Sequence, residues 1–310
     1  MTYFENFSFK GFFKDLYEKT LETDLFGRAA QVAFYFSFAF FPLLLFLVTL
    51  FGLVLDSTES LEAKLYYYFA QLMPPSAYSL VRTTMTEIIE NSSGGKLTLG
   101  AVVTLWSASA GVDSLRNSLN SVYEVDESRA WWYTTLQSLV LTLLFILLLA
   151  VALGILTAGW QLAQTAVDAA GYQISSPLVL TSIQWIGLLV VTLFTTAVVY
   201  SWLPSFEEFH WVWISPGAIV AILLWLVFTG GFRLYLQFFN SYNKSYGSLG
   251  AVIILMLWMY LTGMALLIGG AINSVLTERS ESSGAKEAKK NTAAYAVSEA
   301  NKQQARRRGA

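Results

Sequence analysis

Six apolar blocks separated by polar segments dominate the hydrophobic pattern of the chain. They cover residues 29–55, 97–112, 135–159, 178–203, 213–239 and 249–276. About 20 apolar residues suffice for a helix to cross a hydrocarbon core of roughly 30 Å. The blocks are continuous rather than alternating, which favours helices over the strands of a membrane barrel. The pattern therefore predicts an all-α fold, a polytopic membrane helix bundle with about six transmembrane helices.

The polar flanking segments indicate shorter helices at the membrane surface. Aromatic and leucine side chains recur at helical spacing between Phe9 and Tyr17, which predicts an interfacial amphipathic helix, the alternative being a mobile N-terminus. Residues 56–95 are too polar to span, and their apolar stripes predict two short helices on the outer surface. The expected division is a cytoplasmic interfacial segment at 1–28, a six-helix transmembrane domain at 29–276, and a disordered cytoplasmic tail at 277–310, with a transiently helical tail as the alternative.

Composition and charge agree with a protein that lives in lipid and has both ends on one side. Apolar residues make up 55% of the chain and charged residues 13%, and the mean hydropathy is +0.53. With six spans, one side collects 14 of the 19 lysines and arginines, of which 8 lie in the tail. Because positive charge concentrates in cytoplasmic segments, we expect both termini in the cytoplasm.

Polar residues inside or beside the spans are the candidates for function, because a polar side chain in hydrocarbon is costly. Asp113 and Arg116 are three residues apart and are expected to pair locally. Gly100, Ser107 and Gly111 share a helical face whose default meaning is close helix packing, with a pore lining as the alternative. The candidate functional polar residues are Tyr35, Ser107, Asp113, Arg116, Asn120, Arg233, Asn240, Lys244, Tyr246 and Asn273, and the structural motif residues are Pro42, Gly100, Gly111, Pro204, Pro216, Gly217, Gly247 and Gly250.

Pro42 and the cluster that begins at Arg233 each lead to a specific structural prediction. Pro42 lies inside the first apolar block, where it removes one backbone donor and should kink the helix. Arg233 precedes a run of asparagines, tyrosines and a lysine up to Tyr246, which forms a polar and aromatic cluster at the outer interface. Such residues usually anchor helices at that depth, and ligand binding is the alternative interpretation.

The sequence offers little to an enzyme. It has no cysteine, and it contains no glycine-rich phosphate loop, nucleophile elbow or zincin motif. Its single histidine, His210, lies beside Glu207 and Glu208, but no second cluster supplies further metal ligands. We therefore expect no catalytic residue, metal or cofactor. With a net charge of −2 we also expect no nucleic-acid partner, leaving membrane lipids, envelope proteins or a second copy of the chain.

Motifs in both halves of the chain resemble the YihY/BrkB family of bacterial inner-membrane proteins, over about Ala29 to Leu276. In the first half they are Ala29, Ala30, Phe34, Tyr35 and Pro42, then Ser107-Ala108-Ser109, Leu115, Leu119, Asn120 and Tyr123; in the second half they are Tyr200, Pro204, Pro216-Gly217-Ala218, Tyr235, Tyr246-Gly247-Ser248-Leu249-Gly250-Ala251, Leu257-Trp258-Met259-Tyr260 and a glycine-rich stretch to Asn273. The resemblance implies six transmembrane helices in the bacterial inner membrane with cytoplasmic ends.

The resemblance leaves the activity open. Family members were once labelled ribonucleases, and some are linked to virulence, serum resistance or envelope lipid traffic. Where relatives often carry a glutamate in the last span, this chain has Ala271 before Ile272 and Asn273, so a proton-coupling carboxylate is not expected. We predict transport or translocation of an envelope-related molecule such as a lipid. The alternatives are a scaffold that recruits envelope partners and, more remotely, a ribonuclease.

Overall fold

The computed structural model describes residues 8–54, 94–169, 171, 176–209, 211–238 and 248–308, together with positions 66–67, 70, 75, 78–79, 81–83 and 86. Its long helices are α1 (Phe9–Glu22), α2 (Leu25–Val54), α5 (Gly94–Val122), α6 (Trp131–Ala169), α7 (Pro177–Trp202), α8 (Pro216–Phe238) and α10 (Ser248–Arg308). No strand occurs in these described ranges, so the all-α fold class is confirmed.

Four of the described helices are long and apolar enough to cross a membrane. The qualifying stretches are Trp131–Thr157 in α6, Leu178–Trp202 in α7, Pro216–Phe238 in α8 and Gly250–Ser280 in α10. The other two predicted spans correspond to α2 and α5. The side chains of α2 from residue 41 on, Pro42 included, lie outside the described part of the chain, and α5 is rich in serine and carries charges. Six spans therefore stay a prediction.

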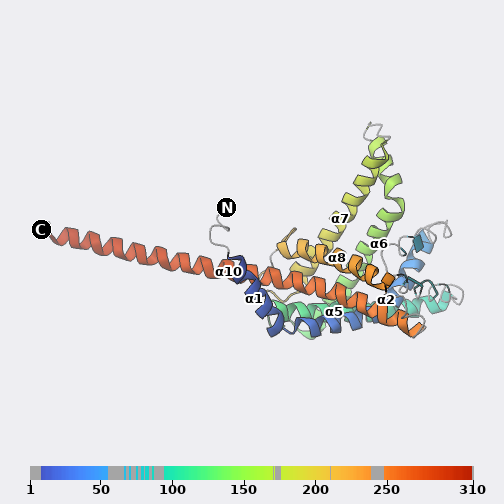
Figure 1. The fold of residues 1–310 in the computed structure, drawn as a ribbon, viewed down its shortest axis with the longest axis horizontal. Helices are drawn as coiled ribbons and strands as arrows, with labels where there is room; N and C mark the ends of the chain where they lie inside the picture. Colours follow the sequence, from blue (N-terminus) through green and yellow to red (C-terminus); the bar gives the residue numbers. More distant parts are fainter. Residues whose placement is uncertain are drawn as a thin grey trace.

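The body of the molecule is a set of helices that lie side by side. α2 packs along both α5 and α10, and α8 packs along α10 (Figure 1). α6 packs on α5 and forms a hairpin with α7, and this α6–α7 hairpin leaves the other helices and projects away from them (Figure 1). α7 and α8 contact each other less extensively than α6 contacts α7 or α8 contacts α10.

One end of the body gathers the segments that the charge pattern assigned to the cytoplasm. α1, the connection between α5 and α6 at 123–130, the connection between α7 and α8 at 203–215, and the part of α10 that follows residue 273 all meet there (Figure 1). We call this the polar end. Both ends of the described chain leave the body there (Figure 1).

The apolar core divides along the length of the bundle. Leu25, Leu119, Leu203 and Leu267 are completely buried in a cluster next to the polar end. A second cluster, towards the opposite end, includes Val81, which belongs to the segment at 56–95. Most of that segment, including the apolar stripes predicted to form surface helices, lies outside the described residues.

The C-terminal segment, expected to be disordered or transiently helical, is helical in this structure. α10 runs without interruption from the last apolar block to Arg308, 61 residues in all, and its end extends well beyond the body (Figure 1). The segment after residue 276 is rich in alanine, lysine, glutamate and glutamine, which favour helices. Because the membrane-spanning part already supplies a formed helix, extension avoids the cost of nucleation.

Candidate functional site

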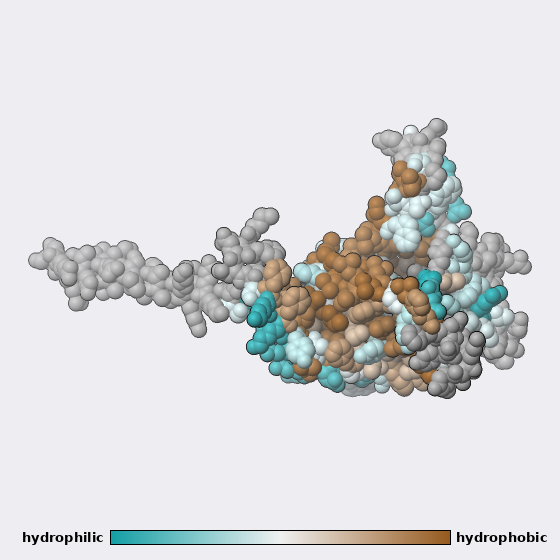
Figure 2. Space-filling model, viewed as in Figure 1, coloured by the Kyte–Doolittle hydropathy of each residue, from teal (hydrophilic) through white to brown (hydrophobic). Residues whose placement is uncertain are grey.

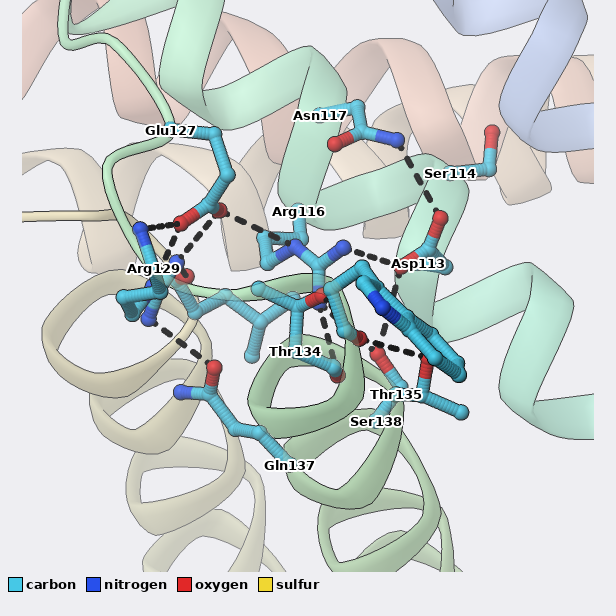
Figure 3. A network of polar contacts seen from close by, with 12 residues as sticks. Asp113, Ser114, Arg116, Asn117, Glu127, Arg129, Thr134, Thr135, Gln137 and Ser138 are labelled. Carbon is cyan, nitrogen blue, oxygen red and sulfur yellow. Dashed lines mark hydrogen bonds and ion pairs between the residues drawn. The ribbon is translucent and has the colours of Figure 1, made fainter.

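Arg116 lies at the centre of a polar network at the polar end (Figure 3). Although only 5% exposed, its guanidinium donates to the backbone oxygen of Thr134 at 2.9 Å and to Ser138 Oγ at 3.1 Å, and it also binds Asp113 and Glu127. A buried charge is tolerated only with such partners. The predicted local pair between Asp113 and Arg116 is confirmed, and it extends across to α6.

The connection between α5 and α6 adds a second arginine to this network. Arg129 binds both carboxylate oxygens of Glu127, at 2.7 and 2.8 Å, in the two-pronged geometry typical of arginine. It also donates to Gln137 Oε1 at 2.9 Å and to the backbone oxygen of Leu203 at 3.1 Å. We call Asp113, Arg116, Glu127 and Arg129 the arginine cluster. It ties the base of α6 to the end of α7.

Electrostatics keep Glu127 ionised. Burial by itself would raise the pKa of this carboxyl, but the hydrogen bonds and charge of Arg129, with the Asn120 amide, lower the pKa to about 2. Asn120 is buried, donates to Glu127 Oε2 at 3.1 Å, and accepts a hydrogen bond from the backbone nitrogen of Ser205 at 2.9 Å. The same amide therefore joins α5 to the connection between α7 and α8.

Asn273 makes a second junction, between α10, α8 and the end of α5. Its oxygen accepts a hydrogen bond from the backbone nitrogen of Gly217 at 2.8 Å, and its nitrogen donates to Ser215 Oγ at 3.0 Å and Tyr123 Oη at 3.4 Å. The first turn of a helix has backbone N–H groups without a partner in the helix. The Asn273 oxygen satisfies one of them at the start of α8, directly after Pro216.

Small residues allow this junction to form. A Cβ on Gly217 would lie 2.0 Å from the backbone oxygen of Gly269 in α10, so the two backbones meet where any side chain would clash. A Cβ on Gly269 would in turn lie 2.3 Å from Tyr200 Oη. That buried hydroxyl donates to the backbone oxygen of Leu266 at 2.8 Å and brings α7 into the junction.

Lys19 joins the N-terminal helix to the same end. Its ammonium is 4% exposed and lies 2.7 Å from Glu124 and 2.5 Å from Glu278. Burial alone would lower the pKa of Lys19, but the hydrogen bonds and charges of the two glutamates raise it above its ordinary value. Arg279 binds Asp15 at 2.6 Å beside it. α1 is thus held by ion pairs to α10 and to the connection that follows α5.

The structure brings together four of the predicted polar residues, Asp113, Arg116, Asn120 and Asn273. Tyr35 instead is exposed on α2 with its ring against Phe34, Ser107 is half-buried in the middle of α5, and Arg233 lies on α8 away from the polar end. Asn240, Lys244, Tyr246 and Gly247, and with them most of the predicted outer cluster, lie outside the described residues, as does His210.

Among the predicted motif residues, most have an identifiable place. Gly111 is buried, and a Cβ there would lie 3.0 Å from the Phe36 ring, so close packing of α5 on α2 accounts for it. Pro204 is buried in the connection after α7, and Gly250 is buried in α10. The side chain positions around Pro42 and Gly100 lie outside the described part of the helices.

Sequence reasoning missed several residues of the polar end, chiefly Lys19, Glu127 and Arg129. A signal existed for Lys19, because it shares the face of α1 that carries Phe12 and Leu16 and so interrupts an otherwise apolar stripe. Glu127 and Arg129 gave no such signal, since charged residues in a short connection are usually solvated. Within the described ranges, no group of three or more His, Cys, Asp or Glu residues is placed to hold a metal ion.

The helical fold, with four described helices able to cross a membrane, places the chain in the class of polytopic α-helical membrane proteins. The chain belongs to the BrkB family, because the family model described as "Virulence factor BrkB" matches residues 16–294. This confirms the predicted resemblance and extends it at both ends. Among similar proteins is the "Putative ribonuclease-like protein YfkH" of Bacillus subtilis (strain 168), 31% identical over 268 residues, which are 86% of this chain and 96% of that relative. No solved structure matches.

Proposed function

We propose that this protein translocates an envelope-related amphipathic molecule, with lipid as the class that fits best. It would do so in a bacterial cytoplasmic membrane, with the polar end in the cytoplasm. The observation that carries the proposal is the separation of α7 from α8. These two helices contact each other next to the polar end and part along the rest of their length (Figure 1). We call the boundary between these two helices the α7–α8 seam.

Burial along α7 supports this view of the seam. Residues 196–200, next to the polar end, are buried in succession, whereas the half of α7 nearer the hairpin tip has a single buried large side chain, Leu180. Only 6% of the apolar stretch of α7 is buried, against 44% for that of α10. α7 therefore offers most of its surface to lipid.

The facing helix has the same character. α8 buries Gly217, Ala218 and Ala221 near its start, and then exposes Leu223, Leu226 and Val227. Apolar side chains cover much of the body near the hairpin (Figure 2). An acyl chain can lie against such a surface without loss of hydration free energy, and the polar end supplies donors and charges for a headgroup. Both properties of an amphipathic substrate are accommodated.

The proposed orientation of the protein in the membrane follows from the distribution of charge and the geometry of the bundle. The segments that carry 14 of the 19 lysines and arginines all begin or end at the polar end. By the positive-inside rule this end faces the cytoplasm. Thiol-reactive labelling tests it, because the chain has no cysteine and a single introduced Ser282→Cys should react only after the cytoplasmic face is opened.

Translocation is tested with the purified protein in liposomes that contain a fluorescent phospholipid and a membrane-impermeant quencher outside. We expect loss of inner-leaflet fluorescence faster than in empty vesicles. In a double variant with Ile186→Cys and Leu234→Cys, a bifunctional thiol reagent links α7 to α8 and should slow this movement. The matched control links Leu147→Cys in α6 to Leu189→Cys in α7, within the hairpin, and should leave it unchanged. No movement above empty vesicles for a broad panel of lipids and solutes would contradict the proposal.

A scaffolding role is the second candidate, and the length of α10 favours it. The helix continues to Arg308, far past the body, where it could present a surface to an envelope partner (Figure 1). Deletion of residues 284–310 separates the two roles, because it keeps Glu278 and Arg279, which hold α1. A translocating protein keeps its lipid movement after this deletion, whereas a scaffold loses its crosslinked partners.

A further inference from the structure

α1 presents three distinct faces around its axis. The helix turns by about 100° per residue, so residues four apart lie nearly above one another. One face carries Asp15 and Lys19, which bind Arg279, Glu278 and Glu124. This face is held against the body by ion pairs.

The second face is aromatic and exposed. Phe13 is 63% exposed and Tyr17 is 65% exposed, although a soluble protein rarely leaves two adjacent aromatic rings in water. The third face is charged. Lys14 and Glu18 form an exposed ion pair of 3.4 Å, about 100° around the helix axis from the rings. The aromatic face therefore lies between the protein on one side and the charged face on the other.

The position of α1 matches that of a helix at a membrane boundary. Asp24, with a φ of 47°, breaks the helix, and α2 begins immediately afterwards at Leu25. α1 crosses the end of the bundle instead of running along it (Figure 1). Its surroundings are hydrophilic on the outer side and apolar towards the body (Figure 2). The chain then continues into α2, whose Phe26 and Phe38 are also exposed.

We propose that α1 is a lipid-binding surface that lies in the headgroup layer of the cytoplasmic leaflet, with Phe13 and Tyr17 in the acyl boundary. α1 leads directly into α2, a largely apolar helix that also exposes aromatic side chains, and this connection favours lipid over a soluble protein as the occupant. The three lysines and three acidic residues of α1 balance, so burial of the rings drives binding and not net charge. The ion pairs of Lys19 and Asp15 fix α1 in this position against α10.

Depth measurements on the full chain test this proposal without relying on the proposed function. Because the chain has no cysteine, Phe13→Cys and Lys14→Cys can each carry one spin label on neighbouring faces of α1. The protein is placed in nanodiscs of phosphatidylethanolamine and phosphatidylglycerol. Collisions of the label are then measured with oxygen, which concentrates in lipid, and with a water-soluble nickel complex. Leu147→Cys on exposed α6 provides the reference for a lipid-facing position.

The measured quantity is the ratio of the label's collision rate with oxygen to its collision rate with the nickel complex. The proposal predicts that this ratio is several-fold higher at position 13 than at position 14, and close to the ratio at position 147. A ratio at position 13 that is no higher than at position 14 and far below that at position 147 would show that the aromatic face is in water. Spin–spin broadening at position 13 would show a second copy of the chain on this face, and shielding from both reagents a protein partner. Any of these three results would overturn the proposal, whatever the outcome of the translocation assay.

Discussion

The two ends of the α6–α7 hairpin are held in very different ways. At the base, Arg116, Arg129 and Gln137 join α6 to α5 and to the end of α7 through several hydrogen bonds and ion pairs. Towards the tip, the hydrogen bonds described between the two helices come from Gln184, which donates to the backbone oxygens of Ile155 and Leu156 at 3.0 Å each. The hairpin is therefore positioned from its base, and its outer half is free to face lipid.

This contrast reflects how the two regions gain stability. In lipid, apolar helix surfaces gain little by contacting each other, so association depends on close packing and polar contacts. The polar end has both, with Gly217 against Gly269 and the hydrogen bonds and ion pairs of the arginine cluster. The outer hairpin has neither in comparable density. The effects of substitution should accordingly be large at the polar end and small near the tip.

The largest effect is expected for Arg116→Met. It removes the partner of Asp113 and leaves the carboxylates of the arginine cluster with less compensation, and breaking a buried ion pair costs roughly 3–5 kcal/mol. Thermal unfolding in detergent, followed by circular dichroism, measures it. The matched control is Lys14→Met, because that side chain is 72% exposed and its ion pair contributes little. Equal losses for both variants would remove the distinction between buried and exposed cations.

The second largest loss of stability is expected for Asn273→Leu. The change keeps the branching of the side chain at Cγ but removes the acceptor of the Gly217 N–H and the donor to Ser215, and an unsatisfied buried group costs about 1–3 kcal/mol. The same melting experiment reports it, with Asn117→Leu on the exposed face of α5 as control. A stability loss no larger than that of the control would mean that Asn273 does not hold α8 to α10.

Near the tip, Gln184→Leu should cost only about 1 kcal/mol, the net value of a typical hydrogen bond. Its consequence should be local, since the bonds join α6 to α7 and not to the body. Hydrogen exchange of the full chain in nanodiscs measures this. We expect faster exchange than in the natural chain in residues 150–190, and an unchanged exchange rate at the polar end. Faster exchange throughout the body would contradict the separation of the two regions.

Acid should weaken the base of the hairpin and spare its tip. The pKa of Glu127 is about 2 in the folded protein against an ordinary value of 4.5, so its ionised form stabilises the fold fully above about pH 4.5, and this stabilisation is lost as the pH falls towards 2. Because Glu127 is partly exposed, we expect a loss of about 1 kcal/mol. Melting temperatures at pH 6 and pH 3 should differ less for Glu127→Gln than for the natural chain. An identical pH dependence would exclude Glu127 as the cause.

Local sequence patterns predicted the elements of both regions but not their long-range contacts. The apolar blocks gave the helices, and the spacing of Asp113 and Arg116 gave their pair, because both depend on residues within a few positions of each other. The bond between Asn273 and Gly217 joins residues 56 apart, and the pair of Lys19 and Glu278 joins residues 259 apart. No periodicity encodes such meetings. The α6–α7 hairpin was foreseen as two spans, but its divergence from α8 depends on packing across the whole bundle.

The separation of α7 from α8 is tested most directly by two distances in the same lipid nanodiscs. Pairs of spin labels at Trp202→Cys with Ile219→Cys, next to the polar end, and at Ile186→Cys with Leu234→Cys, farther along both helices, are measured by pulsed electron resonance. The structure predicts a short and narrowly distributed distance for the first pair and a clearly longer distance for the second. Two equally short distances would show that α7 and α8 adjoin along their whole length, and would contradict the account.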